Sequence, residues 1–157
     1  IEKYDNLLVV QTFSKSRSMA GMRIGYAIGN EELIKALNDF KYSFNSYTMN
    51  QTSLVLGAEA VRDRDYFNEC LEKIMRTRSW AAKELKALGF EFNEPWANFI
   101  FATHPKYPAK ELFEALRKEN IYVRYFNLPR IDNYLRITVG TDAEMETLIH
   151  FLKDYMK

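Results

Sequence analysis

The chain has 157 residues, of which 47% are hydrophobic and 27% charged, and its 22 basic and 21 acidic side chains give a formal net charge of +1. This composition is typical of a folded globular protein, and the balanced charge argues against nucleic-acid and membrane-surface partners. The lone Cys70 excludes an internal disulfide, and there is no signal-peptide pattern and no apolar run of the roughly 18 residues that a membrane span needs, so we expect a cytoplasmic protein.

The first elements predicted along the chain are two strands and two helices. Residues 7–13 (LLVVQTF) are continuously apolar, which predicts a strand covered on both faces and therefore parallel to its neighbours. Residues 23–30 (RIGYAIGN) predict a second strand. Asn30 then caps a helix whose apolar face comprises Leu33, Leu37, Phe40 and Phe44. Residues 43–50 predict a loop, and another helix follows near residues 52–61.

A long helix is predicted from about residue 65 to residue 88, with Gly89 as a left-handed stop and a buried stripe formed by Phe67, Leu71, Ile74, Ala81, Leu85 and Leu88. Strand pieces at 90–92 and 98–102 follow, then a helix from Pro108 to about Asn120. Two neighbouring strands are predicted at 121–126 and 134–139, and in the second apolar and polar residues alternate, as in a half-exposed strand. The capping-box sequence TDAE at 141–144 opens a terminal helix. The order of elements predicts an α/β protein with parts at residues 1–66 and 67–157.

The segment TFSKSRSMAGMRIGY at residues 12–26 carries the chemistry. Lys15 follows the first predicted strand directly, at an end where ligands of parallel sheets gather. Thr12, Ser14 and Arg23 supply two hydroxyls and a guanidinium, a suitable cradle for a phosphate dianion. A deprotonated lysine beside that cradle could attack a phosphorylated aldehyde. On composition alone, an ordinary turn with a solvated lysine is the more frequent explanation.

This segment resembles the lysine motif of the fold-type I pyridoxal-phosphate aminotransferases, above all the histidinol-phosphate aminotransferases. It has the hydroxyl residues, the lysine, the Ala-Gly pair, the arginine eight positions after the lysine and the Gly-Tyr pair. Residues 94–102 (EPWANFIFA) and 123–141 (VRYFNLPRIDNYLRITVGT) are similar to later parts of that family. The resemblance implies the C-terminal half of such an enzyme, so we expect a piece of a longer protein. Residues 1–66 would be a remnant of its large, mostly parallel sheet domain, and residues 67–157 its small α/β C-terminal domain.

The resemblance also implies roles for individual residues around the cofactor. Lys15 would attach covalently to pyridoxal 5'-phosphate and later move a proton between the substrate's α-carbon and the cofactor. Arg23 would bind the cofactor phosphate, with help from Ser14 and Thr12. The parent enzyme would be a homodimer that takes a small-molecule amino donor, histidinol phosphate, and a 2-oxo acid, 2-oxoglutarate, in histidine biosynthesis.

Three further positions are implied to bind the substrate. Arg136 would hold the substrate carboxylate, Arg124 would lie near the distal phosphate, and Asn98 would line the site. Outside the resemblance, an arginine on an exposed strand is usually solvated or paired with a carboxylate. The two histidines, His104 and His150, lie far apart without ligand-like neighbours, so no metal site is predicted.

The departures from the family pattern are as important as the matches. Ser43 and Phe44 stand where a Pro-Tyr pair is common, which leaves Asn45 or Tyr47 to reach a neighbouring subunit. The family's aspartate beside the pyridine nitrogen and its ring-stacking residue have no counterpart in the chain. We therefore expect the chain alone to be catalytically inactive, and pyridoxal phosphate to be absent from it in some preparations. We also expect residues 1–60 to self-associate or to be disordered. A decarboxylase of amino-acid phosphates with the same fold, and a non-enzymatic module that binds a phosphorylated ligand or a protein, stay open as alternatives.

Overall fold

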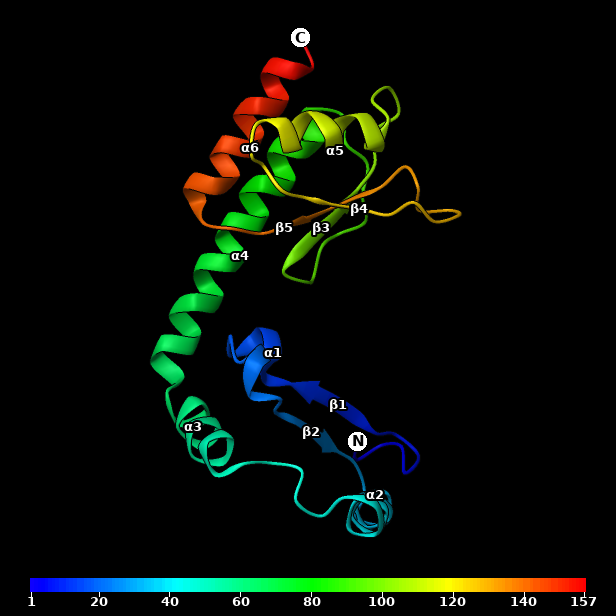
Figure 1. The fold of residues 1–157 in the computed structure, drawn as a ribbon, viewed down its shortest axis with the longest axis vertical. Coiled ribbons are helices and arrows are strands. Elements are labelled where there is room, and N and C mark those ends of the chain that lie inside the picture. Colours follow the sequence, from blue (N-terminus) through cyan, green and yellow to red (C-terminus); the bar gives the residue numbers. More distant parts are fainter. The chain divides into compact units, whose positions relative to one another are not determined.

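The computed structural model describes residues 1–157 and divides the chain into two compact units, Ile1–Asn68 and Glu69–Lys157 (Figure 1). The sequence places the boundary after residue 66. The first unit contains β1 (Val9–Thr12), α1 (Phe13–Ser16), the 3-10 helix η1 (Ala20–Met22), β2 (Gly25–Ile28), α2 (Glu31–Phe44) and α3 (Gln51–Arg62). The long helix α4 (Arg64–Ala87) begins in the first unit and continues into the second. No helix combines the length and the apolar character needed to span a bilayer.

The two strands of the first unit form an antiparallel ribbon in which Thr12 pairs with Gly25 and Val9 with Ile28. The prediction of a parallel strand covered on both faces is wrong for this chain, because β2 is the only partner of β1 and Val10 is 66% exposed. A parallel neighbour requires a long crossover connection, whereas α1 and η1 turn the chain straight back. The apolar run identified the strand correctly but did not identify its partner.

Side-chain caps begin helices α2 and α3, as predicted for α2. The Asn30 Oδ1 accepts a hydrogen bond from the Leu33 N–H at 2.9 Å, and the Asn50 Oδ1 accepts one from the Ser53 N–H at 2.8 Å. Helix α2 extends through Phe44, so the first two residues of the predicted loop are helical. Phe40 and Phe44 stack on each other, yet they are 70% and 83% exposed. Self-association through residues 1–60, expected from the uncovered strand at residues 7–13, stays a prediction.

The second unit consists of a three-stranded antiparallel sheet covered on one face by helices. Its strands are β3 (Phe99–Ala102), β4 (Arg124–Tyr125) and β5 (Leu135–Thr138), in the spatial order β3-β5-β4. Helices α4, α5 (Ala109–Lys118) and α6 (Asp142–Tyr155) pack against this sheet (Figure 1). The core contains Leu85, Ile100, Leu112, Leu116, Leu135, Ile137 and Leu152, each at most 2% exposed. Along β5, buried and exposed residues alternate as predicted, while the predicted strand at 121–126 shrinks to two residues.

The apolar stripe of α4 is only half buried. Ala81 and Leu85 are fully buried, as predicted, but Leu71 and Ile74 are 41% and 37% exposed. The core of the second unit contacts the C-terminal part of the helix and does not extend to its earlier turns. Helical periodicity therefore gave the correct face but overestimated the length of helix that is covered.

Gly89 and His104 together build the turn that ends α4. Gly89 has a φ of 90°, in the left-handed region, as its predicted role requires. The His104 Nδ1 accepts hydrogen bonds from the N–H groups of Lys106 and Tyr107, so its Nε2 carries the hydrogen and donates to the Leu88 carbonyl at 3.0 Å. The buried imidazole thus ties the end of α4 to the segment that leads into α5.

Substituting Gly89 with alanine should destabilise the protein by about 1–3 kcal/mol. The Cβ of an alanine at this position would lie 3.0 Å from the His104 Nε2. The alanine would also have to adopt a left-handed backbone conformation. Urea unfolding measures the loss. Gly21→Ala is the control because its Cβ would meet nothing within 4 Å and its φ is not positive. Equal losses for the two variants would contradict this account of the turn.

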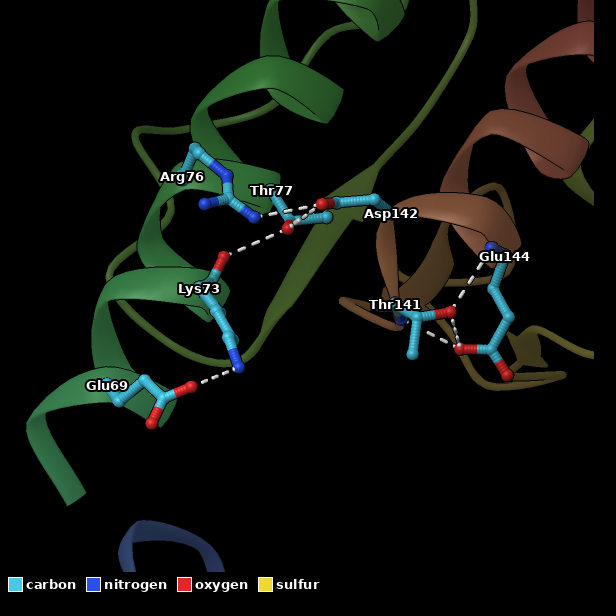
Figure 2. A network of polar contacts seen from close by, with 7 residues as sticks. All are labelled: Glu69, Lys73, Arg76, Thr77, Thr141, Asp142 and Glu144. Atoms are coloured by element: carbon cyan, nitrogen blue, oxygen red, sulfur yellow. Dashed lines mark hydrogen bonds and ion pairs between the residues drawn. The ribbon is translucent and has the colours of Figure 1, made fainter. Parts of the chain in front are cut away.

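A polar network joins α4 to the start of α6 (Figure 2). The buried Thr77 hydroxyl contacts both the Lys73 carbonyl and the Asp142 carboxylate, and the Arg76 Nη2 lies 2.9 Å from the Asp142 Oδ2. Next to it, the predicted capping box is present, because the Thr141 hydroxyl accepts from the Glu144 N–H and the Glu144 carboxylate accepts from the Thr141 N–H. The network fixes the connection between β5 and α6.

The contact with Asp142 should make stability acid-sensitive. The hydrogen bond from Thr77, and then Arg76, lower the pKa of the Asp142 carboxyl from its ordinary value. A carboxyl whose pKa is lower in the folded state stabilises the fold above its unfolded-state pKa and loses that contribution as the pH falls through the folded-state pKa. We expect Asp142→Asn to be less stable than wild type at neutral pH and to lose less stability on acidification.

Thermal unfolding from neutral pH to about pH 3 measures this difference. Asp132→Asn is the matched control, since the exposed Asp132 makes no hydrogen bond or ion pair through its side chain. Parallel pH profiles for wild type and Asp142→Asn would rule out the proposed stabilisation.

Candidate active site

The turn that bears Lys15 lies between the two paired strands of the first unit. Thr12 ends β1, and Ser14 and Lys15 lie in the single helical turn α1. The Phe13 N–H donates to the Ile24 carbonyl at 3.0 Å. Because Arg23 directly precedes Ile24, this hydrogen bond brings the backbone of Arg23 next to the segment that carries Ser14 and Lys15. The structure thus brings together the four residues predicted to bind the cofactor.

Lys15 is exposed, and its ammonium group makes no hydrogen bond or ion pair within the chain. The hydroxyls of Thr12 and Ser14 likewise have no hydrogen-bond partner, whereas the Ser16 hydroxyl donates to the Thr12 carbonyl at 3.1 Å. One amine and two hydroxyls of the same turn are therefore available to a ligand. These groups fit an aldehyde that carries a phosphate, since the amine can react with the former and the hydroxyls can donate to the latter.

Arg23 takes an unusual backbone conformation for a residue with a side chain. Its φ and ψ are 56° and 40°, in the left-handed region, at the end of η1. Its Nη1 donates to the Ala20 carbonyl at 2.9 Å, which leaves other guanidinium donors facing solvent. Backbone strain of this kind persists where the surrounding structure requires it and gathers at functional sites. The guanidinium is thus held on the turn while it retains donors for an anion.

Helix α3 packs against the turn that carries Lys15 and Arg23 and holds it in place. The Ser53 hydroxyl, which is 2% exposed as a residue, donates to the Met22 carbonyl at 2.9 Å. Gly57 allows close approach of the turn, because a Cβ there would lie 2.8 Å from the Ile24 Cδ1. Neither residue was identified from the sequence, since a serine and a glycine within a helix give no local signal of a partner 31 or more residues away.

The second unit holds the predicted substrate arginines. Arg124 on β4 and Arg136 on β5 are directly opposite each other, which confirms that they lie on neighbouring strands. Both are exposed, neither makes an ion pair, and each guanidinium lies 5.5 Å from an aromatic ring, Phe126 for Arg124 and Phe99 for Arg136. Like charges directly opposite on one sheet face repel each other. An anionic ligand would relieve that repulsion, so the pair is a candidate anion site.

Aromatic side chains surround this arginine pair on the uncovered sheet face. Phe101, the residue opposite Arg136 on β3, stacks on Tyr134 with ring centroids 4.7 Å apart. A cleft of about 670 Å³ adjoins it and includes Phe99, Trp96 and Arg130 in its lining. Asn98 is exposed and uses its carbonyl to accept a hydrogen bond from the Val139 N–H, which leaves its side-chain amide free. The sequence did not identify the cleft, because its residues come from two separate segments, 91–103 and 130–134.

Comparisons with known proteins agree on one family. The family model described as aminotransferase class I and II matches residues 1–152. A histidinol-phosphate aminotransferase of Clostridium botulinum is 52% identical over 153 residues, which is 98% of this chain and 43% of that protein.

Solved structures share the fold. The histidinol-phosphate aminotransferase from Clostridium acetobutylicum has a TM-score of 0.87 at 24% identity and is matched over 99% of this chain and 47% of its own. The histidinol-phosphate aminotransferase from Sinorhizobium meliloti, solved in complex with pyridoxal-5'-phosphate, has a TM-score of 0.81 at 24% identity and is matched over 97% of this chain and 41% of its own. The chain thus spans less than half the length of the proteins it resembles.

Proposed function

This chain belongs to the class I and II aminotransferase family, and from that premise we propose that it supplies the lysine and the substrate arginines of a pyridoxal-phosphate-dependent enzyme. The proposed reaction moves the amino group of histidinol phosphate to 2-oxoglutarate. The substrate assignment is supported by the 52% identity to a protein of that name. We further propose a cytoplasmic homodimer as the working form of the whole protein.

The observation that carries the proposal is the state of Lys15. Its amine is exposed and unpaired, on a turn that also carries two unpaired hydroxyls and fixes Arg23. A lysine used only for solubility or for an ion pair would not require the left-handed arginine and the buried serine that hold this turn. The donor set fits pyridoxal phosphate, with Lys15 for its aldehyde and Arg23, Ser14 and Thr12 for its phosphate.

Pyridoxal phosphate, when bound, supplies an electron-withdrawing ring that acidifies the proton on the substrate's α-carbon. Lys15 then removes that proton as a general base and returns it as a general acid, which a tethered amine can do without a further group. Arg23 holds the phosphate end and so fixes the position at which the Lys15 amine acts.

Arg124 and Arg136 bind the charged ends of the two substrates in turn. Histidinol phosphate carries its negative charge on a phosphate, whereas 2-oxoglutarate carries two carboxylates. Two adjacent guanidinium groups suit both, because each offers planar paired donors to either kind of anion. Asn98 lines the same region in this proposal.

Assays of the protein expressed from its complete reading frame test the proposal. Histidinol phosphate and 2-oxoglutarate should yield glutamate, and no CO₂ should be released from phosphorylated amino acids that keep their carboxylate. Release of CO₂ without transamination would favour the decarboxylase alternative. Tight binding of phosphorylated ligands without turnover would favour the non-enzymatic module.

A further inference from the structure

Arg17 lies two residues after Lys15, and its side chain makes a contact within the first unit that has no role in the lysine motif or in the proposed reaction. Its guanidinium carbon lies 3.8 Å from the centroid of the Phe67 ring, in the first turns of α4. Its Nη1 is buried and has no hydrogen-bond partner in the chain. A half-buried arginine that leaves a donor unpaired costs free energy, so the stack on Phe67 must hold it there.

The helical turn α1, which carries Lys15, has few contacts that hold it in place. Helix α1 has only four residues, and its end is closed by the N–H groups of Arg17 and Met19, which both donate to the Phe13 carbonyl. Ser18, which lies between Arg17 and Met19, has a φ of 55°, in the left-handed region. A single helical turn beside such a residue is not stable by itself. It depends on side chains that connect it to larger elements.

Two side chains provide these connections, one on each side of Lys15. Phe13, two residues before the lysine, is buried beside Gly57 of α3. Arg17, two residues after it, lies on Phe67 of α4. Lys15 is thus an exposed residue midway between two anchored side chains, and the direction of its amine depends on both.

We propose that Arg17 is a positioning residue, whose stack on Phe67 fixes the turn that presents the Lys15 amine. The inference rests on the proposed function insofar as Lys15 does the chemistry. Its structural part stands independently, because the stack and the turn belong to the chain itself. Arginine is suited to this task because its flat cation pairs with the face of an aromatic ring.

The test uses the protein expressed from its complete reading frame, in the variants Arg17→Met, Phe67→Leu and the double variant. Arg17→Lys keeps a cation over the ring and serves as the conservative rescue. Arg64→Met is the matched control, since Arg64 lies in the same helix as Phe67, is exposed and has no hydrogen-bond or ion-pair partner. Urea unfolding shows that each variant is folded before it is compared.

Two readouts are needed. Hydrogen exchange of the amides of residues 15–19, measured without cofactor, should become about tenfold faster in Arg17→Met and in Phe67→Leu. The double variant should exchange at the same rate as either single variant, because all three lose the same contact. The kcat for transamination should fall by about tenfold with KM changed by less than about twofold, because the loss concerns the orientation of the lysine and not substrate binding. Arg17→Lys should recover most of both values, and Arg64→Met should match wild type.

Unchanged exchange in Arg17→Met would overturn the proposal, and so would faster exchange with an unchanged kcat or a loss confined to KM. A wild-type protein that folds but does not transaminate would refute the proposed function itself, and with it the catalytic consequence of Arg17, whatever the exchange data show. The cofactor-free exchange measurement therefore separates the two failures.

Discussion

Lys15→Arg in the whole protein should lower kcat for transamination by about a thousandfold or more. Arginine keeps the positive charge and nearly the length of lysine, but it stays protonated and can neither react with an aldehyde nor accept a proton. Steady-state assays with histidinol phosphate and 2-oxoglutarate measure the loss. Lys110→Arg is the control, since Lys110 is exposed on α5 without an ion pair and should behave as wild type.

The same assignment predicts the site of covalent labelling. Borohydride treatment in the presence of pyridoxal phosphate should leave the cofactor attached at Lys15 in the wild-type protein and at no defined position in Lys15→Arg. Peptide mapping identifies the labelled residue. A label on another lysine, or a Lys15→Arg variant that retains activity within about tenfold of wild type, would contradict the assignment.

The parts of the fold that could be predicted from the sequence depend on residues close together in the chain. The cap at Asn30, the box formed by Thr141 and Glu144 and the left-handed Gly89 each involve groups within a few positions. The alternation along β5 is equally local, because a strand turns successive side chains to opposite faces. Such features are decided by short-range geometry, and the structure confirms them.

The errors concern what covers an element. The run at residues 7–13 predicted a doubly covered parallel strand, but β1 has one antiparallel neighbour and an exposed face. Likewise Leu71 and Ile74 continue the apolar stripe of α4 beyond the core that covers it. A pattern of apolar residues reveals which side of an element prefers burial, whereas the extent of burial depends on segments elsewhere.

The candidate site divides in the same way. The motif indicated Lys15 and Arg23 because their residue types and spacing are local, and the pairing of Arg124 with Arg136 could be anticipated from two adjacent strands. The contacts that support the turn could not be predicted, because each joins residues far apart in the chain: Ser53 with Met22, and Arg17 with Phe67. The roles of all these residues in catalysis stay proposals.

The second large effect concerns Arg124, whose replacement by alanine should change which substrates the whole protein accepts. Losing one partner of a charged, hydrogen-bonded contact costs about 2–5 kcal/mol when the other partner is left buried. We expect kcat/KM for histidinol phosphate to fall accordingly, while aromatic amino acids without a phosphate are affected little. The expected selectivity follows from the position of Arg124 opposite Arg136, which remains available to a single carboxylate.

Parallel assays with histidinol phosphate and with an unphosphorylated aromatic amino acid measure this selectivity. Arg124→Lys should show an intermediate loss, because a lysine keeps the charge but not the paired donors that match a phosphate. Arg117→Ala, on the exposed side of α5 and without an ion pair, is the control for removing a positive charge from the second unit. If both substrate classes lost activity equally in Arg124→Ala, the residue would be a general structural or electrostatic support and not the group that recognises the phosphate.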